Sequence, residues 1–384
     1  PQMTLTPTSE ADLSETIAAS RASKTPLEIV GGGTRLGLGK PVQAAERLSI
    51  SALSGITLHE PGALTLVAQA GTPLAEIEAA LASENQRLPF EPMDHRALMG
   101  SDGEPTIGGV VAANVSGPRR IQAGACRDSL IGVRFVDGQG TVVKNGGRVM
   151  KNVTGYDLVK LMAGSYGTLG VLTEVSFKVL PAPEATAVVL FDGLDVARAV
   201  ECMTEAMGTP YDLSGAAHVP VGRDGAPVTM LRLEGFAKSV AYRAEALTKE
   251  LRGFGTPRVE TDDEATAAGW RWIRDVEAFA GRPGDVWRIS VKPTDGVRVA
   301  EALTDAQLVM DWSGGLVWAL VPEGTPVRAA LTGIPGHATL VRASPTTRAA
   351  TEVFAPEAAP IRAISAGLRA KFDPAGILNP GRMG

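Results

Sequence analysis

Glycine placement constrains the fold of this chain most, beginning with the loop Gly31 to Gly37 that follows the short apolar run Leu27 to Val30. An apolar run that ends in glycines predicts a strand leading into a loop. Glycines let backbone N–H groups approach an anion closely, and Thr34 adds a hydroxyl donor. Taken alone, the loop is explained equally well as a tight turn after a strand. Its spacing supports neither a Rossmann fingerprint nor a Walker A loop.

Two further segments rich in small residues argue against the interpretation of the first glycine loop as a mere tight turn. The segment Pro105 to Gly117 contains Thr106, Gly108 and Gly109, which can bring the N-terminus of a helix up to a phosphate. The segment Asn152 to Leu172 places three glycines just before a strand: Gly164, Gly167 and Gly170. Three unrelated turns explain these segments less well than one ligand that contacts all of them.

Local patterns predict the elements around these segments. The expected elements are a strand at Ala63 to Ala70, a helix capped by Thr72 with Pro73 at its first position and an end near Arg87, a helix after Gly108 and Gly109, and a hairpin at Ile131 to Val143.

A period of two between Val171 and Leu180 predicts a half-buried strand, and Pro181 and Pro183 end it. We interpret these two prolines as a domain boundary and expect domains at 1–181 and 182–384. Strands alternate with amphipathic helices in the second part, which favours an α+β domain. The expected helices are Val196 to Met207 and Val240 to Leu251, and the expected strands are Ala187 to Phe191, Val228 to Glu234, Trp287 to Lys292 and Leu316 to Val321.

Composition narrows the class of protein. The 384 residues suffice for two or three domains, and 44% hydrophobic with 21% charged residues is typical of a globular protein. The formal net charge of −5 argues against a general attraction to nucleic acid or anionic lipid, so we expect no nucleic-acid partner.

The only cysteines are Cys126 and Cys202. Two cysteines exclude a disulfide framework, a four-thiolate zinc site and an iron–sulfur cluster held by this chain alone. We therefore expect the protein to reside in a reducing compartment. No apolar run approaches the roughly 18 residues of a transmembrane helix, and residues 1–23 lack the regions of a secretory leader. We expect a cytoplasmic protein, and a peripheral place on the inner membrane through a partner stays open.

Three motifs occur in a fixed order: G-G-G-T at 31–34, T-I-G-G-x-x-A-x-N at 106–114, and G-S-x-G-T-L-G-x-x-T-E at 164–174. Together they resemble the FAD-binding domain of the vanillyl-alcohol-oxidase type of flavoprotein, over residues 1 to about 181. The segment 372–383 (FDPAGILNPGRM) resembles the end of the C-terminal domain of the same family. The resemblance implies an α+β fold in which a two-part FAD-binding domain precedes an α+β cap domain whose C-terminal tail returns to the flavin.

The same resemblance implies one extended FAD with its pyrophosphate at the first two loops and its adenine end near Gly170 and Val171. Noncovalent FAD is expected, because Thr34 stands where some members have a linking His, and Cys126 is expected to be a small buried residue. Tyr166 replaces the usual Glu of the third motif. The positions implied to contact FAD are Gly31, Gly32, Gly33, Thr34, Arg35, Leu36, Gly37, Pro92, Thr106, Gly108, Gly109, Ala112, Asn114, Gly117, Gly170, Val171 and Asn379.

Three segments of the second half, V-W-R-I-S-V at 286–291, D-W-S-G-G at 311–315 and G-H-A-T-L-V-R at 336–342, resemble the smaller FAD-binding subunit of bacterial glycolate oxidase. This resemblance runs almost from end to end. It implies a complex that oxidises glycolate, a small 2-hydroxy acid, to glyoxylate, with a larger FAD-binding subunit and an iron–sulfur subunit as partners.

Oxidation of a 2-hydroxy acid requires a base for the hydroxyl proton and a cation for the carboxylate. The candidates are His337 as base and Arg288 and Arg342 as carboxylate clamps. A hydrogen-bonded turn histidine and salt-bridged structural arginines are the alternatives. Trp312 either stacks at the flavin or is a core indole, and the stretch 118–120 is either a solvated loop or a surface that faces a partner.

No metal site is predicted. The resemblance to those D-2-hydroxyacid dehydrogenases that consist of a single polypeptide implies a histidine-rich metal motif in the second domain, which this chain lacks. Its four histidines lie far apart in the sequence: His59, His95, His218 and His337.

Three functions are consistent with these residues. The chain relays electrons or supports assembly within a glycolate oxidase complex, it oxidises a 2-hydroxy acid with its own flavin, or it is a structural subunit with a vestigial flavin site. The missing histidine motif counts against the second function, and the intact glycine loops count against the third.

Overall fold

A computed structural model describes residues 2–147 and 155–384 of the chain. The first part of the chain forms a small parallel sheet in the order β1-β3-β2 and an antiparallel sheet in the order β4-β5-β9-β7-β8. The strands of these sheets are β1 (Met3–Leu5), β2 (Leu27–Val30), β3 (Glu46–Ser49), β4 (Ile56–Glu60), β5 (Thr65–Gln69), β7 (Leu130–Val136), β8 (Val142–Gly146) and β9 (Val171–Lys178).

A two-stranded pair, β6 (Gln86–Arg87) with β10 (Leu180–Pro181), precedes the second part of the chain, which forms one eight-stranded antiparallel sheet. Its order is β14-β11-β13-β12-β16-β17-β15-β18. Its strands are β11 (Ala185–Asp192), β12 (Gly215–Val219), β13 (Val228–Gly235), β14 (Arg258–Glu260), β15 (Asp285–Val291), β16 (Gln307–Asp311), β17 (Leu316–Val321) and β18 (Gly336–Arg342).

Helices cover these sheets, and the short ones lie mainly near the glycine segments. The described α-helices are α1 (Glu10–Ser23), α2 (Leu74–Ser83), α3 (Arg96–Met99), α4 (Ile107–Ala112), α5 (Arg120–Ala123), α6 (Cys126–Ser129), α7 (Leu158–Met162), α8 (Val196–Met207), α9 (Ala237–Glu250), α10 (Asp263–Arg274), α11 (Gly296–Ala302), α12 (Val327–Ala330), α13 (Pro345–Ala350) and α14 (Ala359–Phe372). Among the residues described, no helix is long and apolar enough to cross a membrane.

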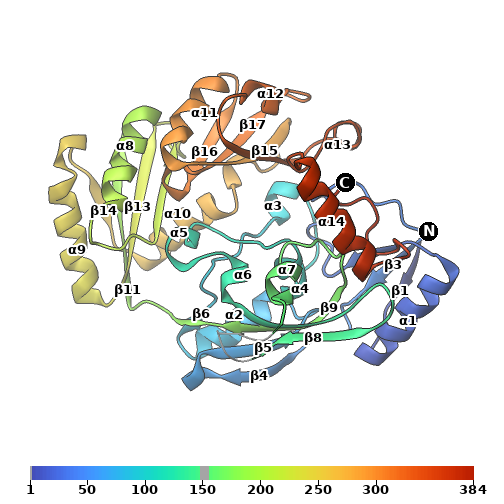
Figure 1. Cartoon of the computed structure of the whole chain (residues 1–384). Helices are drawn as coiled ribbons and strands as arrows, with labels where there is room; N and C mark the ends of the chain where they lie inside the picture. The colour runs from blue at the N-terminus through green and yellow to red at the C-terminus, as the bar shows by residue number, and fades with distance from the viewer. Residues whose placement is uncertain (1, 148–154) are drawn as a thin grey trace.

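The two sheet systems lie side by side, and the end of the chain returns to its beginning (Figure 1). After α14 the tail reaches β2, where Leu27 donates a backbone hydrogen bond to Ile377 and Asn379 donates one to Leu27. This architecture is the expected α+β fold, with a C-terminal tail that comes back to the first domain.

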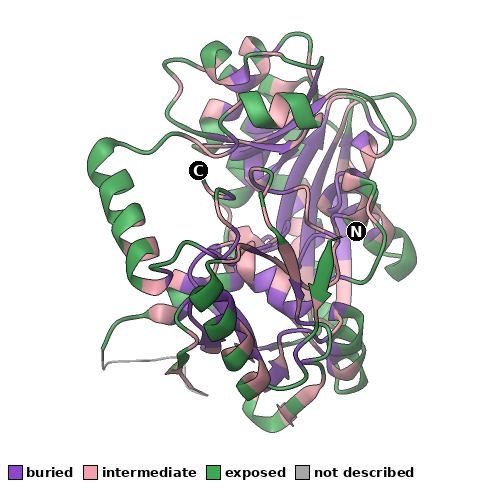
Figure 2. Ribbon diagram, turned by 90° about the vertical axis from the view of Figure 1, so that its right-hand side faces the viewer, coloured by how far each residue is buried: buried purple, intermediate pink, exposed green. Residues whose placement is uncertain are grey.

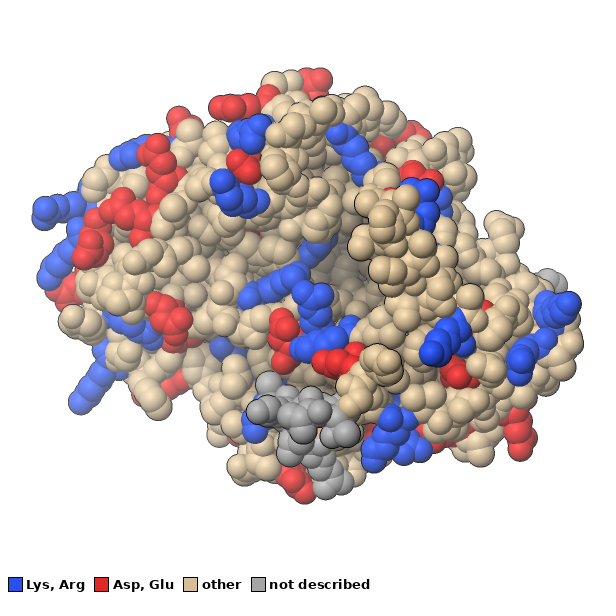
Figure 3. All heavy atoms as spheres, viewed as in Figure 1, with Lys and Arg blue, Asp and Glu red and all other residues tan. Residues whose placement is uncertain are grey.

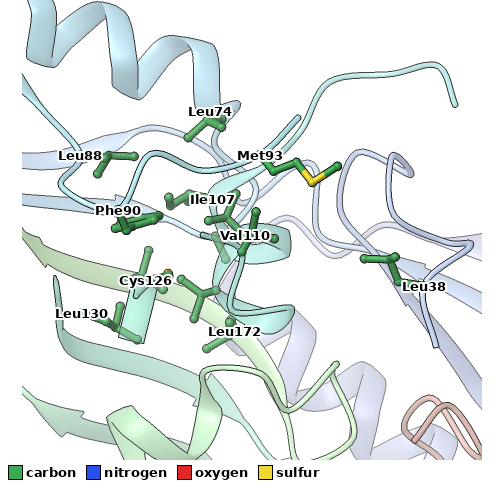
Figure 4. Packing of buried hydrophobic residues seen from close by; sticks show 14 of the residues in the cluster. Leu38, Leu74, Leu88, Phe90, Met93, Ile107, Val110, Cys126, Leu130 and Leu172 are labelled. Carbon is green, nitrogen blue, oxygen red and sulfur yellow. The ribbon is translucent and has the colours of Figure 1, made fainter. Parts of the chain in front are cut away.

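Hydrophobic side chains of the first part form a continuous core around α4 (Figure 4). Ile107 and Val110 of α4 are fully buried, as are Phe90 and Cys126 in the same cluster. Burial raises the pKa of the Cys126 thiol, so this side chain is a neutral packing group. Its expected burial is therefore confirmed.

Three sequence expectations were wrong in detail. The helix expected from Thr72 to Arg87 is shorter, because the Thr72 hydroxyl bonds to Gly55 and Gln69 instead of capping the helix. Residues 86–87 leave the helix to form β6. The helix expected after Gly109 begins earlier, at Ile107, because the Thr106 hydroxyl accepts a hydrogen bond from the Gly109 N–H and caps it.

The second part of the chain follows its local patterns closely. Val196–Met207 and Leu316–Val321 have the expected bounds, the other expected strands are confirmed within two residues, and α9 starts three residues early, at Ala237. The alternating strand β9 ends at Lys178, and its Ser176 is buried where the pattern predicted exposure. Part of the third glycine segment, 152–154, lies outside the described residues.

Candidate functional site

Two loops packed backbone to backbone form one wall of a cavity in the first domain. A Cβ at Gly32 would lie 1.6 Å from the carbonyl oxygen of Glu104, and a Cβ at Gly31 would lie within 2.4 Å of the Thr106 hydroxyl. Only glycine allows this approach. The cavity encloses about 810 Å³, including space open to solvent. We call it the cradle.

The cradle wall offers unsatisfied donors. In the described part of the chain, the backbone N–H groups of Gly31 to Arg35 donate to no other residue. Arg35 donates from Nε to Nδ1 of His95 at 3.1 Å and from Nη2 to the carbonyl oxygen of Met93 at 3.0 Å. Burial without an ion-pair partner lowers the pKa of Arg35 to about 10. Free amides beside an uncompensated guanidinium form a site for an anion.

The C-terminal tail completes the lining of the cradle with Asn379 and Arg382. Asn379 accepts a hydrogen bond from the Ile29 N–H at 2.8 Å and donates from Nδ2 to the carbonyl oxygen of Tyr166 at 2.8 Å. Arg382 donates from Nη1 to the carbonyl oxygen of Leu38 at 2.9 Å. A Cβ at Gly167 would lie 2.7 Å from Nδ2 of Asn379, so the absence of a side chain at Gly167 leaves room for the tail. Loops more than 200 residues apart in sequence therefore share one site.

Most of the implied FAD positions line the cradle, with four exceptions. Gly37 and Pro92 do not line it, and Asn114 and Gly117 line a neighbouring cavity instead. The positions that line the cradle are Gly31, Gly32, Gly33, Thr34, Arg35, Leu36, Thr106, Gly108, Gly109, Ala112, Gly170, Val171 and Asn379.

The neighbouring cavity lies between the first domain and the eight-stranded sheet and encloses about 900 Å³ with its open space. It shares Leu38, Ala113 and Tyr166 with the cradle, so the two cavities are adjacent. We call it the interdomain cavity. On the face seen in Figure 3, Lys and Arg side chains gather around a recess in the middle of the molecule.

Two arginines without partners meet at an indole in the interdomain cavity. The guanidinium of Arg120 lies 4.7 Å from the Trp312 ring centroid, and that of Arg288 lies 5.1 Å from it. Within the described residues neither side chain has a hydrogen bond or an ion pair. Burial and the nearby Arg120 charge lower the pKa of Arg288 to about 10. The indole Nε1–H donates to the Gly117 carbonyl oxygen at 3.1 Å, so Trp312 also joins the two domains.

Two titratable groups of this cavity have strongly shifted pKa values. Asp311 is 3% exposed, and burial raises the pKa of its carboxyl to about 7 although its Oδ1 accepts the Trp312 N–H at 2.7 Å. Burial and the Arg35 charge hold the pKa of His95 well below its usual value. Since a guanidinium can only donate, Nδ1 of His95 is the acceptor and the ring is neutral.

The other candidate residues of the second half occupy different environments. His337 is exposed on β18 and lines neither cavity. Arg342 donates to the carbonyl oxygens of Leu98 and Phe279 at 3.0 Å each, and also to that of Arg282. The roles of His337 and Arg342 stay predictions, and of the three candidates only Arg288 reaches the interdomain cavity.

Sequence reasoning missed several residues of these cavities. Ile29, Leu38, Ala113 and Arg382 line the cradle although no motif assigned them a role. Tyr166, noted only as a departure from the family motif, lines both cavities and has a positive φ of 54°. The sequence position of Asp311 next to Trp312 was a signal that could have identified it as a residue of the interdomain cavity. Nothing in the sequence indicated the contact between Arg35 and His95.

Among the described residues, no group of three or more His, Cys, Asp or Glu side chains lies close enough together to hold a metal ion.

The family model of the FAD binding domain matches residues 1–146. The glycolate oxidase subunit GlcE of Escherichia coli (strain K12) is 37% identical over 373 residues, which cover 97% of this chain and 96% of that protein. The glycolate oxidase subunit GlcD of Bacillus subtilis (strain 168) is 30% identical over 200 residues, covering 51% of this chain and 41% of that protein.

Solved structures share the fold at low sequence identity. A p-cresol methylhydroxylase structure with substrate bound matches with a TM-score of 0.73 and 16% identity, over 99% of this chain and 88% of that one. An alkyldihydroxyacetonephosphate synthase structure matches with a TM-score of 0.72 and 16% identity, over 98% of this chain and 75% of that one. The full-length similarity to GlcE, together with the matched FAD-binding domain, shows that the chain is an FAD-binding oxidoreductase subunit that belongs to the glycolate oxidase GlcE family.

Proposed function

We propose that the chain is the smaller FAD-holding subunit of a complex that oxidises glycolate to glyoxylate. In this complex it relays electrons or supports assembly beside a larger catalytic flavin subunit and an iron–sulfur subunit. The proposal divides the chain into an FAD-binding domain at 1–181 and a cap domain at 182–384. It places the complex in the cytoplasm, with any attachment to the inner membrane made through partners.

The observation that carries the proposal is the cradle closed by its own tail. The free amides of Gly31 to Arg35 and the unpaired Arg35 charge fit a pyrophosphate, and Gly170 and Val171 would face the adenine end. When bound, FAD supplies a group that accepts electrons from a donor and passes them on. Thr34 of the first loop and the buried Cys126 favour FAD held without a covalent bond.

A second candidate function is oxidation of a 2-hydroxy acid by this chain alone, and Arg288 is the observation that favours it. An unpaired guanidinium in a cavity adjacent to the cradle suits a substrate carboxylate, and Arg120 adds a second cation beside the same indole. Arg288 would then clamp the carboxylate, and the exposed His337 would need to move to act as the base. A vestigial flavin site is disfavoured because the amides of the cradle remain free to donate.

The test is an absorbance spectrum of the purified protein, recorded without oxygen before and after addition of glycolate or D-lactate. We expect a flavin spectrum that stays oxidised with this subunit alone and is bleached when the partner subunits are added. Rapid bleaching with this subunit alone would establish the second function. A protein that lacks flavin, and stays without it after incubation with FAD, would contradict both.

A further inference from the structure

Helix α14 has an unusual environment for a helix of 14 residues. None of its residues is buried, and no other described helix or strand packs extensively against it. Figure 2 shows it almost entirely in the colour of exposed residues, at the side of the molecule where the tail returns. Its last part contacts the rest of the protein: Leu368 and Phe372 pack against the core, and the Phe372 ring lies 6.1 Å from that of Phe135.

The exposed surface of α14 is amphipathic. Ile361, Ile364, Leu368 and Phe372 follow the spacing of three and four residues that places side chains on one face of a helix. Leu368 and Phe372 pack partly against the core, whereas Ile361 is 52% exposed and Ile364 is 61% exposed. The apolar stripe therefore starts on the protein and continues into solvent.

Cations border this stripe on both sides. At 100° per residue, Arg362 and Arg369 lie along one edge of the stripe and Lys371 lies along the other. The helix contains no carboxylate, although the protein as a whole carries a net charge of −5. The acidic residues that flank it in sequence are Glu357, which accepts a hydrogen bond from the Ser365 hydroxyl at 3.2 Å, and Asp373, which accepts the N–H groups of Ile377 and Leu378.

Helices of this length are marginal in water unless an apolar face is buried, and Gly367 in the middle adds a cost of about 1 kcal/mol relative to alanine. In this protein only the last part of α14 has a face to pack against. A surface that covers Ile361 and Ile364 would supply the missing burial.

We propose that α14 is the docking surface for another subunit of the glycolate oxidase complex, and that this subunit presents an apolar patch bordered by carboxylates. The proposal rests on the proposed function, which gives the protein its partner subunits. Charge complementarity selects the partner's chemistry, because every charged side chain of the helix itself is a cation: Arg362, Arg369 and Lys371. A membrane is less suited, because two exposed isoleucines provide little apolar area for insertion.

The docking surface would also be linked to the cradle. The tail that follows α14 begins at Asp373, whose carboxylate accepts the N–H groups of Ile377 and Leu378, and continues to Asn379 in the cradle. A subunit bound on α14 would therefore hold the segment that closes the flavin site.

The test compares two double variants of the full-length protein, each expressed together with the other subunits of its glycolate oxidase. Ile361→Glu with Ile364→Glu places two charges in the stripe. Ala363→Glu with Ala370→Glu places the same charges on the opposite face of the same helix and serves as the control. Co-purification, the mass of the complex, and flavin absorbance are measured for each.

We expect the isoleucine variant to bind the partner roughly tenfold more weakly or worse, because a buried carboxylate is strongly disfavoured. The alanine variant should bind normally, and both should retain flavin. Normal co-purification of the isoleucine variant would overturn the inference. The inference would also be overturned if the isoleucine substitutions only abolished a homodimer of the isolated protein, or only abolished its binding to phosphatidylglycerol vesicles. If the unaltered protein itself carries flavin but joins no other subunit, the proposed function fails, and the docking inference fails with it.

Discussion

Asn379 is the residue at which the end of the chain meets the flavin site. Its side-chain amide uses both of its functions, accepting from Ile29 and donating to Tyr166, and its φ of 42° is one that asparagine tolerates better than most residues. The residue is 3% exposed, so water cannot replace these bonds easily.

Asn379→Ala is expected to lower the free energy of unfolding by about 1–3 kcal/mol, because a buried N–H and a buried carbonyl lose their partner. Flavin should also dissociate faster, since the tail no longer holds the cradle. Thermal unfolding and the fluorescence of released FAD measure the two effects. An alanine variant that unfolds at the same temperature as the native protein and releases FAD no faster would contradict this account.

Asp311 gives the interdomain cavity a pH dependence. The pKa of its carboxyl is raised to about 7 by burial, so the folded protein binds its proton more tightly than the unfolded state does. The stabilising effect of this proton is complete below the ordinary carboxyl pKa of about 4 and is lost as the pH rises through about 7.

Asp311→Asn is therefore expected to flatten the dependence of stability on pH between about pH 4 and 7. Relative to the native protein, the free energy of unfolding of the variant should be a few kcal/mol higher at high pH. Asparagine retains an oxygen that accepts the Trp312 N–H. Urea unfolding across this range provides the measurement. Parallel pH profiles for the variant and the native protein would show that Asp311 is not the group responsible.

Helix α4 shows how an element depends on two adjacent glycines for different reasons. A Cβ at Gly108 would lie 2.8 Å from the Ala70 carbonyl oxygen, at the end of β5. A Cβ at Gly109 would lie 3.4 Å from the Thr106 hydroxyl and 3.6 Å from Arg35 Nη1, which are close but acceptable contacts. The first glycine is needed for packing, and the second faces the cradle.

Gly108→Ala should destabilise the fold by about 1–3 kcal/mol through overpacking, even though alanine favours helices by about 1 kcal/mol. Gly109→Ala should leave stability nearly unchanged and reduce FAD affinity. Paired measurements of unfolding and FAD titration separate these outcomes. Equal stability of the two variants would refute the assigned packing role of Gly108.

At the scale of the whole molecule, a buried ionic cluster joins the two domains. Glu234 of β13 accepts from Arg87 at 2.7 Å and from Arg119 at 3.0 Å, and Glu91 accepts from Arg232 at 2.8 Å. Arg119 and Arg232 hold the pKa of Glu91 down at about 2, and the surrounding arginines lower that of Glu234 further. The stability from these carboxylates is present above their ordinary pKa and is lost as the pH falls through the lowered values.

Glu234→Gln should cost about 3–5 kcal/mol, because it leaves buried guanidinium groups without their counter-charge. Guanidinium chloride is unsuitable for the measurement because it screens charges, so urea unfolding is preferred. Glu245→Gln, which removes an exposed pair with Lys249, is the control and should leave the free energy of unfolding nearly unchanged. Similar costs for the two variants would mean that the cluster does not hold the domains together.

Features that depend on neighbours along the polypeptide could be predicted from the sequence. Periodicity and punctuation located strands and helices such as Val196–Met207, and the glycine motifs identified the loops of the cradle, because loop conformation and helix faces are set over a few residues. A local pattern gave a wrong prediction where a long-range contact used the same group. Thr72 has the character of an N-cap, but its hydroxyl accepts a hydrogen bond from the Gly55 N–H instead.

The folded structure, in contrast, was needed to show which charged side chains share a cavity and which are paired elsewhere. Arg288 and Arg342 are equivalent candidates in sequence, yet one lies unpaired beside Trp312 and the other binds three backbone carbonyls. The pairing of Asn379 with Ile29 spans 350 residues. Contacts of this kind arise when separate elements pack together, and burial then sets the charge state of each group, which no local pattern records.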